Sequence, residues 1–387
     1  MRFSLPVSGL ACGLAFLACF GCSSSGASNP AADDAALVDS ASSDVAADAT
    51  DAIDDGDGAA PALRLAVEGD HLVDPDGKRI VLRGWNWGNW GTEQPQDAKD
   101  NAEKQHANAV RIPVRWWGDY PASMNARDDA APEGHMNVDR LKELDHTIQD
   151  ATRAHLWVVL FIDSNCGQAS SVHDTVAACG TGSDGKPANF MNDTASRDAF
   201  FDLWKFLAKR YASTPYIGMY ELLPEPNFGC KAGGGCPDWT LSNEFYTALL
   251  PVVRAADPRT PVLVGPNGGY EIRQLETAFM PGTEGVVYTG DLLQHAASDP
   301  ASVDLATAFR AAHGVPVFIQ QVGVPKSNAT ATDIVNRVLG QLRDADIGWT
   351  WWTYREPFSK GDGFAPYYGS PWQEDTAWLG LISGYFP

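Results

Sequence analysis

The sequence predicts a single (β/α)8 barrel, or TIM barrel, over residues 62–387. Eight short apolar runs alternate with segments in which apolar residues repeat at helical spacing. The 387 residues are enough for one large barrel or two ordinary domains, and eight such strands in that length favour the barrel. No glycine-rich phosphate loop follows the first run, which disfavours a dinucleotide-binding sheet.

Each element follows from local pattern. Residues 63–84 alternate apolar and polar side chains around Gly69-Asp70 and a turn at 74–77, which predicts a β-hairpin leading into the barrel. The predicted barrel strands are 80–87, 109–114, 157–163, 217–223, 261–265, 285–293, 316–322 and 347–354. Helical spacing is clearest in segments 138–148, 200–211 and 334–342, which are therefore predicted to be helices between strands.

Residues 1–22 have the pattern of an export signal. Arg2 precedes an apolar stretch, residues 10–20, that is too short to cross a bilayer; a buried helix is the alternative. Cys22 follows Gly21 and precedes a serine run, which is typical of a bacterial lipoprotein site where the cysteine receives a diacyl chain. Cys19 stands where such a site usually has leucine, and cleavage at Cys19, after Phe16-Leu17-Ala18, is the alternative.

Residues 23–61 predict a disordered tether. They are almost entirely Ala, Ser, Gly and Asp, with nine Asp and no Lys or Arg, and such a segment cannot bury a core. These nine charges contribute to a net charge of −21, which argues against nucleic-acid partners. We expect an exported monomer, either secreted or a cell-envelope lipoprotein at the outer membrane or cell surface, touching the membrane only through its lipid anchor.

Four cysteines remain in the predicted barrel, an even number in an exported chain. Three pairings are open, and short loop closure favours Cys166–Cys179 and Cys230–Cys236. Zinc is the competing interpretation, but the two close pairs fall in separate loops and no histidine is suitably placed. The sequence indicates no cofactor and no metal.

Tryptophans gather at the predicted C-terminal ends of strands, where barrel enzymes carry their active sites. Aromatic faces stack on the apolar faces of sugar rings, so this cluster suits an oligosaccharide groove. For each tryptophan the alternative is packing in the barrel core or rim. The seven are Trp85, Trp87, Trp90, Trp116, Trp117, Trp351 and Trp352.

Four motifs in order resemble glycoside hydrolase family 5, the cellulases, over the whole barrel. They are Leu82-Arg83-Gly84-Trp85-Asn86, Asn108-Ala109-Val110-Arg111-Ile112-Pro113, Tyr220-Glu221-Leu222-Leu223-Pro224-Glu225-Pro226 and Pro316-Val317-Phe318-Ile319. The resemblance implies a retaining mechanism with a strand-four acid/base glutamate and a strand-seven nucleophilic glutamate, their carboxyls about 5 Å apart. Glu225 matches the acid/base; the alternative is a solvated loop carboxylate.

The nucleophile position of the family falls on Gln321, within Ile319-Gln320-Gln321-Val322-Gly323. A neutral amide is a poor nucleophile and stabilises a cationic transition state poorly. Pro224 occupies the position of the asparagine that binds the sugar 2-hydroxyl in the family. Further departures are Asp163 at the strand-three histidine, and Asp291 and Leu293 at the strand-six histidine and tyrosine. Divergence explains several changes around one spot more simply than a single engineered change or an error.

Other family positions are kept. Arg111 and Trp352 match the family arginine and strand-eight tryptophan, and with Trp87 and Trp117 they are the predicted sugar contacts. The changed site leaves Asp163, Glu225 and Asp291 at neighbouring strand ends. They are either charge-compensated rim residues or a carboxyl cluster, and the cluster would suit calcium only if the three converge.

Three functions follow. The first is a surface-tethered protein that binds β-linked polysaccharide or oligosaccharide and has lost retaining hydrolysis. The second is an active glycoside hydrolase with Glu225 as acid and Asp291 or Asp163 activating water, which requires carboxyls about 6.5–9.5 Å apart and inverts the product. The third is a barrel recruited to bind a non-sugar partner. A groove lined by Trp352 favours the sugar readings.

Overall fold

The computed structural model describes residues 63–88, 95–120, 124–169, 179–230, 236–357 and 359–387. The predicted signal (1–22), linker (23–61) and lipidation at Cys22 or Cys19 lie outside these residues, as does Trp90. Within the described ranges, no helix is both long and apolar enough to cross a membrane.

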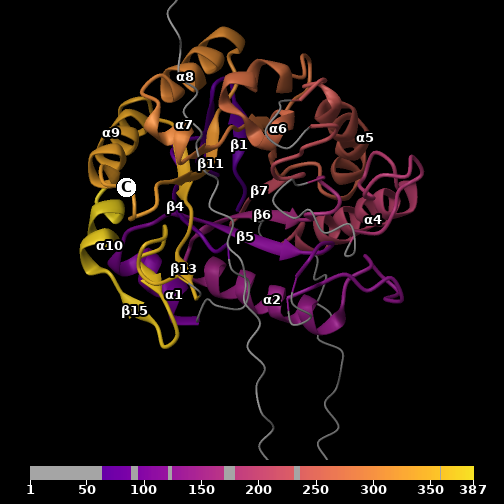
Figure 1. Cartoon of the computed structure of the whole chain (residues 1–387), viewed down its shortest axis with the longest axis horizontal. Helices are drawn as coiled ribbons and strands as arrows, with labels where there is room; N and C mark the ends of the chain where they lie inside the picture. Colours follow the sequence, from indigo (N-terminus) through magenta and orange to yellow (C-terminus); the bar gives the residue numbers. More distant parts are fainter. Residues whose placement is uncertain (1–62, 89–94, 121–123, 170–178, 231–235, 358) are drawn as a thin grey trace, which may run out of the picture. The chain divides into compact units, whose positions relative to one another are not determined.

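A parallel barrel forms the centre of the described chain, as predicted (Figure 1). Its sheet has the order β10-β11-β12-β4-β5-β6-β7-β8-β9, and a bridge between Tyr288 and Val317 joins β9 to β11. The predicted strand 285–293 is divided into two, because residues 289–291 leave the ladder. The strands are β4 (Arg83–Asn86), β5 (Ala109–Arg115), β6 (Trp157–Asp163), β7 (Ile217–Glu221), β8 (Val262–Val264), β9 (Val286–Tyr288), β10 (Leu292–Leu293), β11 (Phe318–Gly323) and β12 (Gly348–Trp351).

Helices surround these strands (Figure 1). In α2, Asn137 caps the first turn through its side chain, and Leu144 and Ile148 are buried. The helices are α1 (Pro95–Lys99), a π-helix (Asp100–Lys104), α2 (Val138–Arg153), α4 (Thr194–Tyr211), α5 (Leu241–Ala256), α6 (Asn267–Tyr270), a 3₁₀ helix (Ile272–Ala278), α7 (His295–Ser298), α8 (Ser302–His313), α9 (Ala331–Asp344) and α10 (Thr376–Ser383). A small sheet of β13 (Arg355–Glu356), β14 (Tyr367–Tyr368) and β15 (Gln373–Glu374) follows strand eight of the barrel.

The predicted N-terminal hairpin is a three-stranded antiparallel sheet. Both expected turns form, and they join β1 (Ala66–Glu68), β2 (His71–Val73) and β3 (Arg79–Ile80). Leu65 and Leu72 of this segment are buried in the same cluster as inward-facing barrel residues. The N-terminal sheet therefore closes one end of the barrel and leaves the other end for the site.

The barrel interior has two kinds of layer, because alternate side chains of each strand face inward. The apolar layer lies next to the N-terminal sheet and includes Ala109, Trp157, Val159, Met219, Leu263, Val287 and Phe318. Toward the C-terminal ends of the strands follows a polar layer of fully buried side chains. We define it as Asn86, Arg111, Glu221, Thr289, Gln320 and Thr350.

Candidate functional site

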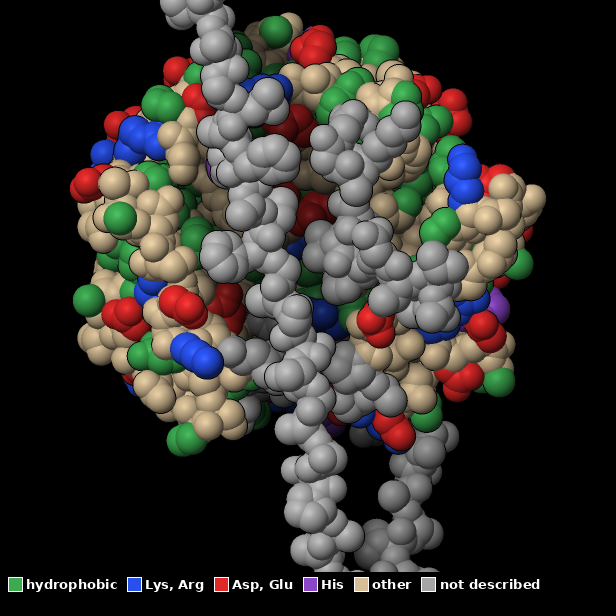
Figure 2. All heavy atoms as spheres, viewed as in Figure 1, with side chains coloured by type: hydrophobic (Ala, Val, Ile, Leu, Met, Phe, Trp, Pro, Cys, Tyr) green, Lys and Arg blue, Asp and Glu red, His purple; other side chains and the backbone are tan. Residues whose placement is uncertain are grey.

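A cavity of about 390 Å³ opens at the C-terminal ends of the barrel strands. Its described lining combines charged, amide and aromatic side chains: Gly88, Arg111, Arg115, Phe161, Asp163, Asn165, Gln168, Pro224, Glu225, Leu293, Gln294, Gln321, Trp352 and Phe364. Figure 2 shows acidic side chains deep in the hollow at the centre of this face. The site is thus a small polar cavity with aromatic walls.

Glu225 and Gln321 meet in this cavity. Glu225 lies just beyond the end of β7 with a positive φ of 42°, and Gln321 lies on β11. The side-chain amide of Gln321 donates a hydrogen bond to Oε1 of Glu225. Burial raises the pKa of Glu225, while the charge of Arg111 and this hydrogen bond act in the opposite direction. Glu225 therefore holds its proton to a higher pH than an exposed glutamate, as a general acid needs.

Asp291 lies directly beside Glu225. The two carboxyl groups share a hydrogen bond, and Gln320 donates its amide to Asp291 Oδ1. Burial, followed by the charge of Glu225, raises the pKa of Asp291 well above its ordinary value. Two adjacent carboxyls cannot both ionise cheaply, so the pair holds a proton between them.

Arg111 and Glu221 form a buried ion pair beneath the cavity. Arg111 Nε lies 2.6 Å from Glu221 Oε2 and Arg111 Nη2 lies 2.9 Å from Glu221 Oε1, a bidentate arrangement. The guanidinium carbon lies 3.5 Å from the centroid of the Phe161 ring. Nη1 of Arg111 is buried with no hydrogen-bond partner among the described residues. The cavity floor therefore presents one unsatisfied cationic donor.

Asp163 ends β6 and lines the wall next to Glu225. The Tyr120 phenol donates a hydrogen bond to it, and the phenol oxygen accepts one from Asn165 N at 3.1 Å. Burial, and then the charge of Asp163, raise the pKa of Tyr120 well above its usual range, so the phenol stays neutral. Among the described residues, no group of three or more His, Cys, Asp or Glu side chains is arranged to hold a metal ion.

The model of the cellulases, glycosyl hydrolase family 5, matches residues 73–356. The chain belongs to this family. Endoglucanase E-5 of Thermobifida fusca is 26% identical over 180 residues, 43% of this chain and 36% of that protein. A probable glucan 1,3-β-glucosidase A of Aspergillus fumigatus is 27% identical over 201 residues, 52% of this chain and 42% of that protein. The chain thus aligns with less than half the length of each relative.

Solved structures of family 5 share the barrel. Thermotoga maritima Cel5A in complex with cellobiose has a TM-score of 0.57 at 18% identity, covering 78% of this chain and 97% of that one. The catalytic domain of Thermobifida fusca Cel5A, as a glutamate-to-glutamine variant in complex with cellotetraose, has a TM-score of 0.57 at 19% identity. That comparison covers 84% of this chain and 91% of the other. These likenesses establish the fold.

Only one of the predicted sugar-contact tryptophans lines the cavity of this family-5 barrel. The ring of Trp352 lies so close to Gly88 that a Cβ there would stand 2.3 Å from it, so glycine at 88 makes room for the indole. The bond from Trp352 to Thr353 is a cis peptide. Trp85, Trp116 and Trp351 are fully buried core residues, as their alternative reading allowed.

Trp87 and Trp117 were predicted to contact sugar. Both are packed in the interior, and neither is among the described residues that line the cavity. The indole of Trp87 donates to Asn101 Oδ1 at 3.0 Å, and only 2% of the residue is exposed. Trp117 packs on Phe190 and lies under the guanidinium of Arg127, 5.1 Å from its ring centroid. Local sequence could not separate these indoles from Trp352.

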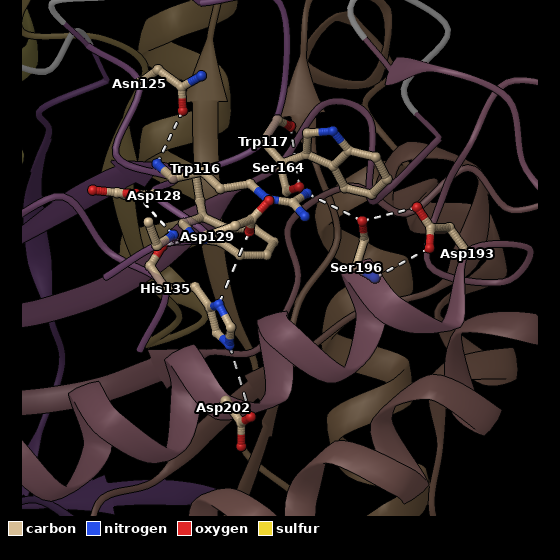
Figure 3. A network of polar contacts seen from close by, with 12 residues as sticks. Trp116, Trp117, Asn125, Asp128, Asp129, His135, Ser164, Asp193, Ser196 and Asp202 are labelled. Carbon is tan, nitrogen blue, oxygen red and sulfur yellow. Dashed lines mark hydrogen bonds and ion pairs between the residues drawn. The ribbon is translucent and has the colours of Figure 1, made fainter. Parts of the chain in front are cut away.

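Figure 3 shows the polar contacts around Trp116 and Trp117. Arg127 Nη1 donates to Ser196 Oγ at 3.1 Å, and Ser196 in turn donates to Asp193, the N-cap of α4. The Trp116 indole donates to the His135 carbonyl at 2.9 Å. The network joins the loop after β5 to the start of α4.

Both predicted disulfides form. Cys166 bonds Cys179 and Cys230 bonds Cys236, with Cα–Cα distances of 5.2 and 4.1 Å. The first follows β6 and the second follows β7 in sequence, at the ends of the strands that carry Asp163 and Glu225. The two disulfides therefore constrain the segments that follow β6 and β7, near the site.

Several site residues were not singled out from the sequence. Glu221 is the clearest, because a charged residue inside a buried strand demands a partner, and this signal was available in the strand-four motif. Asn86 is fully buried with neither amide atom hydrogen-bonded among the described residues. Asn165, Gln168, Gln294 and Phe364 come from loops, where spacing carries no information about what they face.

Proposed function

We propose that the chain is an exported, surface-tethered protein that binds β-linked glycans through a family-5 barrel and has lost retaining hydrolysis by a protein nucleophile. The observation that carries this is Gln321. The family resemblance aligns this residue with the nucleophile, and its amide donates to Glu225, the acid/base candidate. An amide in that position offers neither a covalent nucleophile nor a charge for an oxocarbenium ion.

Binding is supported by the cavity itself. Trp352 and Phe161 supply aromatic surface, while Arg111, Asn165 and Gln168 supply polar groups for hydroxyls. Crystal structures titled as complexes with cellobiose, mannotriose and cellotetraose exist for barrels of this fold, the last with a glutamate-to-glutamine variant. By analogy, a glutamine-bearing barrel is compatible with holding an oligosaccharide.

Export and tethering rest on the sequence of residues 1–61 and are supported by the two disulfides, which form in oxidising compartments. We propose diacylation at Cys22, with Cys19 the alternative. Mass spectrometry of the processed N-terminus distinguishes the two cysteines, and cell fractionation of Cys22→Ala against Cys19→Ala identifies the anchor.

An inverting hydrolase is the second candidate, because Asp163 lines the cavity together with Glu225. Asp291 does not suit the base in such a reaction. It is hydrogen-bonded to Glu225, whereas inversion needs about 6.5–9.5 Å between carboxyls to seat a water. A non-sugar partner would be favoured by a groove closed by the two disulfide loops, and residues 170–178 and 231–235 of those loops lie outside the described residues.

The test is a glycan array with the purified protein, followed by a reducing-sugar assay on every glycan that binds. Binding to β-glucans or β-mannans with no measurable retaining hydrolysis is the expected result. Robust hydrolysis of β-glucans or β-mannans with retention would refute the loss of the protein nucleophile. Inverting hydrolysis that Glu225→Gln abolishes would favour the second candidate.

A further inference from the structure

Among the described residues that line the cavity, Glu225 is a suitable general acid and Asp163 is the only other carboxyl. Glu225 lines it and has a raised pKa because it is buried. Hydrolysis of a β-glycoside also needs a nucleophile at the anomeric carbon or a base that activates water. Gln321 donates a hydrogen bond to Glu225, but its side chain is a neutral amide and can act neither as the nucleophile nor as the base.

Two nearby carboxyls are unsuited to the missing role. Both oxygens of Glu221 are engaged by Arg111, and the residue is fully buried and outside the described cavity lining. Asp291 is hydrogen-bonded to Glu225. A covalent nucleophile needs about 5–5.5 Å between the carboxyls and an inverting base about 6.5–9.5 Å, and direct contact satisfies neither.

Asp163 remains, and its setting suits an acceptor that positions a substrate group. It lines the cavity at the end of the strand next to β7, and its charge acts on Glu225. The Tyr120 phenol fixes it through a hydrogen bond. Its carboxylate can therefore accept a hydrogen bond from an N–H group of a ligand, while the hydrogen bond from Tyr120 keeps the carboxylate oriented.

One part of the cavity lining is apolar. Leu293 and Phe364 both approach Gly323, and Pro224 precedes Glu225, so these side chains offer no hydrogen-bond donor. A sugar hydroxyl facing them would be left unsatisfied, whereas a methyl group would be buried favourably. This surface favours a ring substituent that ends in a methyl group.

Building on the proposed glycan site, we infer that the barrel acts on β-glycans with a 2-acetamido group, and that this group supplies the nucleophile. The acetamide carbonyl oxygen attacks the anomeric carbon as the glycosidic C–O bond breaks, and the Glu225 proton passes to the leaving oxygen. Water then attacks the anomeric carbon, the bond to the carbonyl oxygen breaks, and the water proton returns to Glu225. One water is consumed, the acetamide is restored, and the anomeric configuration is retained.

Charge supports this course. The intermediate is a cationic oxazolinium ring. Asp163 and Glu225 both line the cavity, and Glu225 is left negatively charged once its proton has passed to the leaving oxygen. Asp163 accepts the acetamide N–H and lies close enough to favour the positive charge that develops there. Asp163 and Glu225 are thus the catalytic residues of this reaction.

The first experiment compares substrates on the unmodified protein. Aryl 2-acetamido-2-deoxy-β-glucoside and chito-oligosaccharides are tested against the matching β-glucoside and cello-oligosaccharides, with product stereochemistry followed by NMR. We expect kcat/KM to be about a hundredfold or more higher on the acetamido substrates, with retention. A series with one, two and three fluorines on the acetamide should react progressively more slowly, because fluorine weakens the carbonyl nucleophile.

The second experiment compares Asp163→Asn with Asp184→Asn, an exposed residue outside the described cavity lining. Asp163→Asn should lower turnover of acetamido substrates about a hundredfold or more and change cello-oligosaccharide binding little, whereas Asp184→Asn should change neither. A purely structural role for Asp163 would lower both. Glu225→Gln should lower turnover of every acetamido substrate, because Glu225 also takes the proton of the attacking water, and most strongly where the leaving group needs protonation.

The outcomes separate the two proposals. Binding of glycans without turnover of acetamido substrates overturns this inference and leaves the proposed binding function standing. Absence of glycan binding in calorimetry overturns both. Inverted product, or a rate that does not respond to fluorination of the acetamide, overturns the substrate nucleophile and points to Asp163 as a base.

Discussion

The two inner layers of the barrel are made by the same strands but follow different chemistry. Phe318 belongs to the apolar layer and Gln320 to the polar layer, two residues apart on β11. The apolar layer consists of close-packed side chains that need no partners. The polar layer leaves buried atoms of Asn86, Arg111 and Gln320 without hydrogen bonds among the described residues. The apolar layer thus stabilises the fold. The polar layer costs some stability because not all of its buried polar atoms are hydrogen-bonded, and it holds Arg111 at the cavity.

The largest effect should come from breaking the apolar layer. Phe318→Ala removes a ring that is 1% exposed, and we expect a loss of about 3–5 kcal/mol in the free energy of unfolding. Urea denaturation followed by tryptophan fluorescence measures it. Leu305→Ala, on an exposed side chain of α8, is the control. A loss below about 1 kcal/mol at Phe318 would mean that this layer does not hold the barrel.

In the polar layer, stability should fall when one member of an ion pair is removed, rather than when side-chain volume is lost. Arg111→Met leaves the buried Glu221 carboxylate without its cation and should cost about 3 kcal/mol. The double variant Arg111→Met with Glu221→Leu should regain most of this, because an apolar pair replaces the ion pair.

The matched control is Arg210→Met, which breaks a bidentate but partly exposed pair with Asp145 and should cost less than about 1 kcal/mol. Equal losses at Arg111 and Arg210 would contradict the view that burial makes the difference.

Affinity for glycan should depend on Trp352 more than on other tryptophans. Trp352→Ala should weaken binding about tenfold or more, equivalent to about 1.4 kcal/mol, because it removes an aromatic wall of the cavity. Trp372→Ala, which removes an exposed indole outside the described lining, should leave affinity unchanged. Calorimetry with cello-oligosaccharides and chito-oligosaccharides provides the comparison, and equal losses would place the glycan elsewhere.

The buried carboxyl pair of Glu225 and Asp291 should make stability fall with rising pH. The pKa of Asp291 is raised in the folded state, so from about pH 4, its ordinary value, upward the native protein keeps a proton that the unfolded chain has lost. Unfolding then releases a proton, and stability decreases until the pH passes the folded pKa. Asp291→Asn should remove this decrease and stabilise the protein at neutral pH by about 1 kcal/mol or more.

Asp198→Asn, on an exposed carboxylate, is the control for that measurement and should leave the pH profile unchanged. Unfolding free energies at several pH values between about 4 and 8 supply the profile. An unaltered slope in Asp291→Asn would mean that another group binds the proton.

The sequence predicted the apolar layer well and the polar layer only in part. Runs such as residues 157–163 and 217–223 are continuous apolar strands, so periodicity and length located them without tertiary information. Glu225 and Gln321 were predicted from sequence motifs. The barrel fold determines which strand ends lie near each other, so these motifs were expected to meet. Trp117 and Trp352 have the same local signature, and only the placement of Arg127 and Gly88 separates a packed indole from a cavity wall.

The smallest effect should come from placing a carboxylate at position 321, which the family resemblance aligns with the nucleophile. In Gln321→Glu, the unpartnered Nη1 of Arg111 offers a cationic donor to the new group, while Glu225 and Asp291 oppose its ionisation and raise its pKa. Pro224 still lacks a side chain that could hydrogen-bond the sugar, so we expect detectable but feeble retaining turnover of an aryl β-glucoside. Pro224→Asn together with Gln321→Glu should turn over faster, each factor of ten corresponding to about 1.36 kcal/mol in the barrier. If neither variant exceeds the unmodified protein on this substrate, the surroundings of position 321 limit the reaction by more than the absence of a carboxylate there.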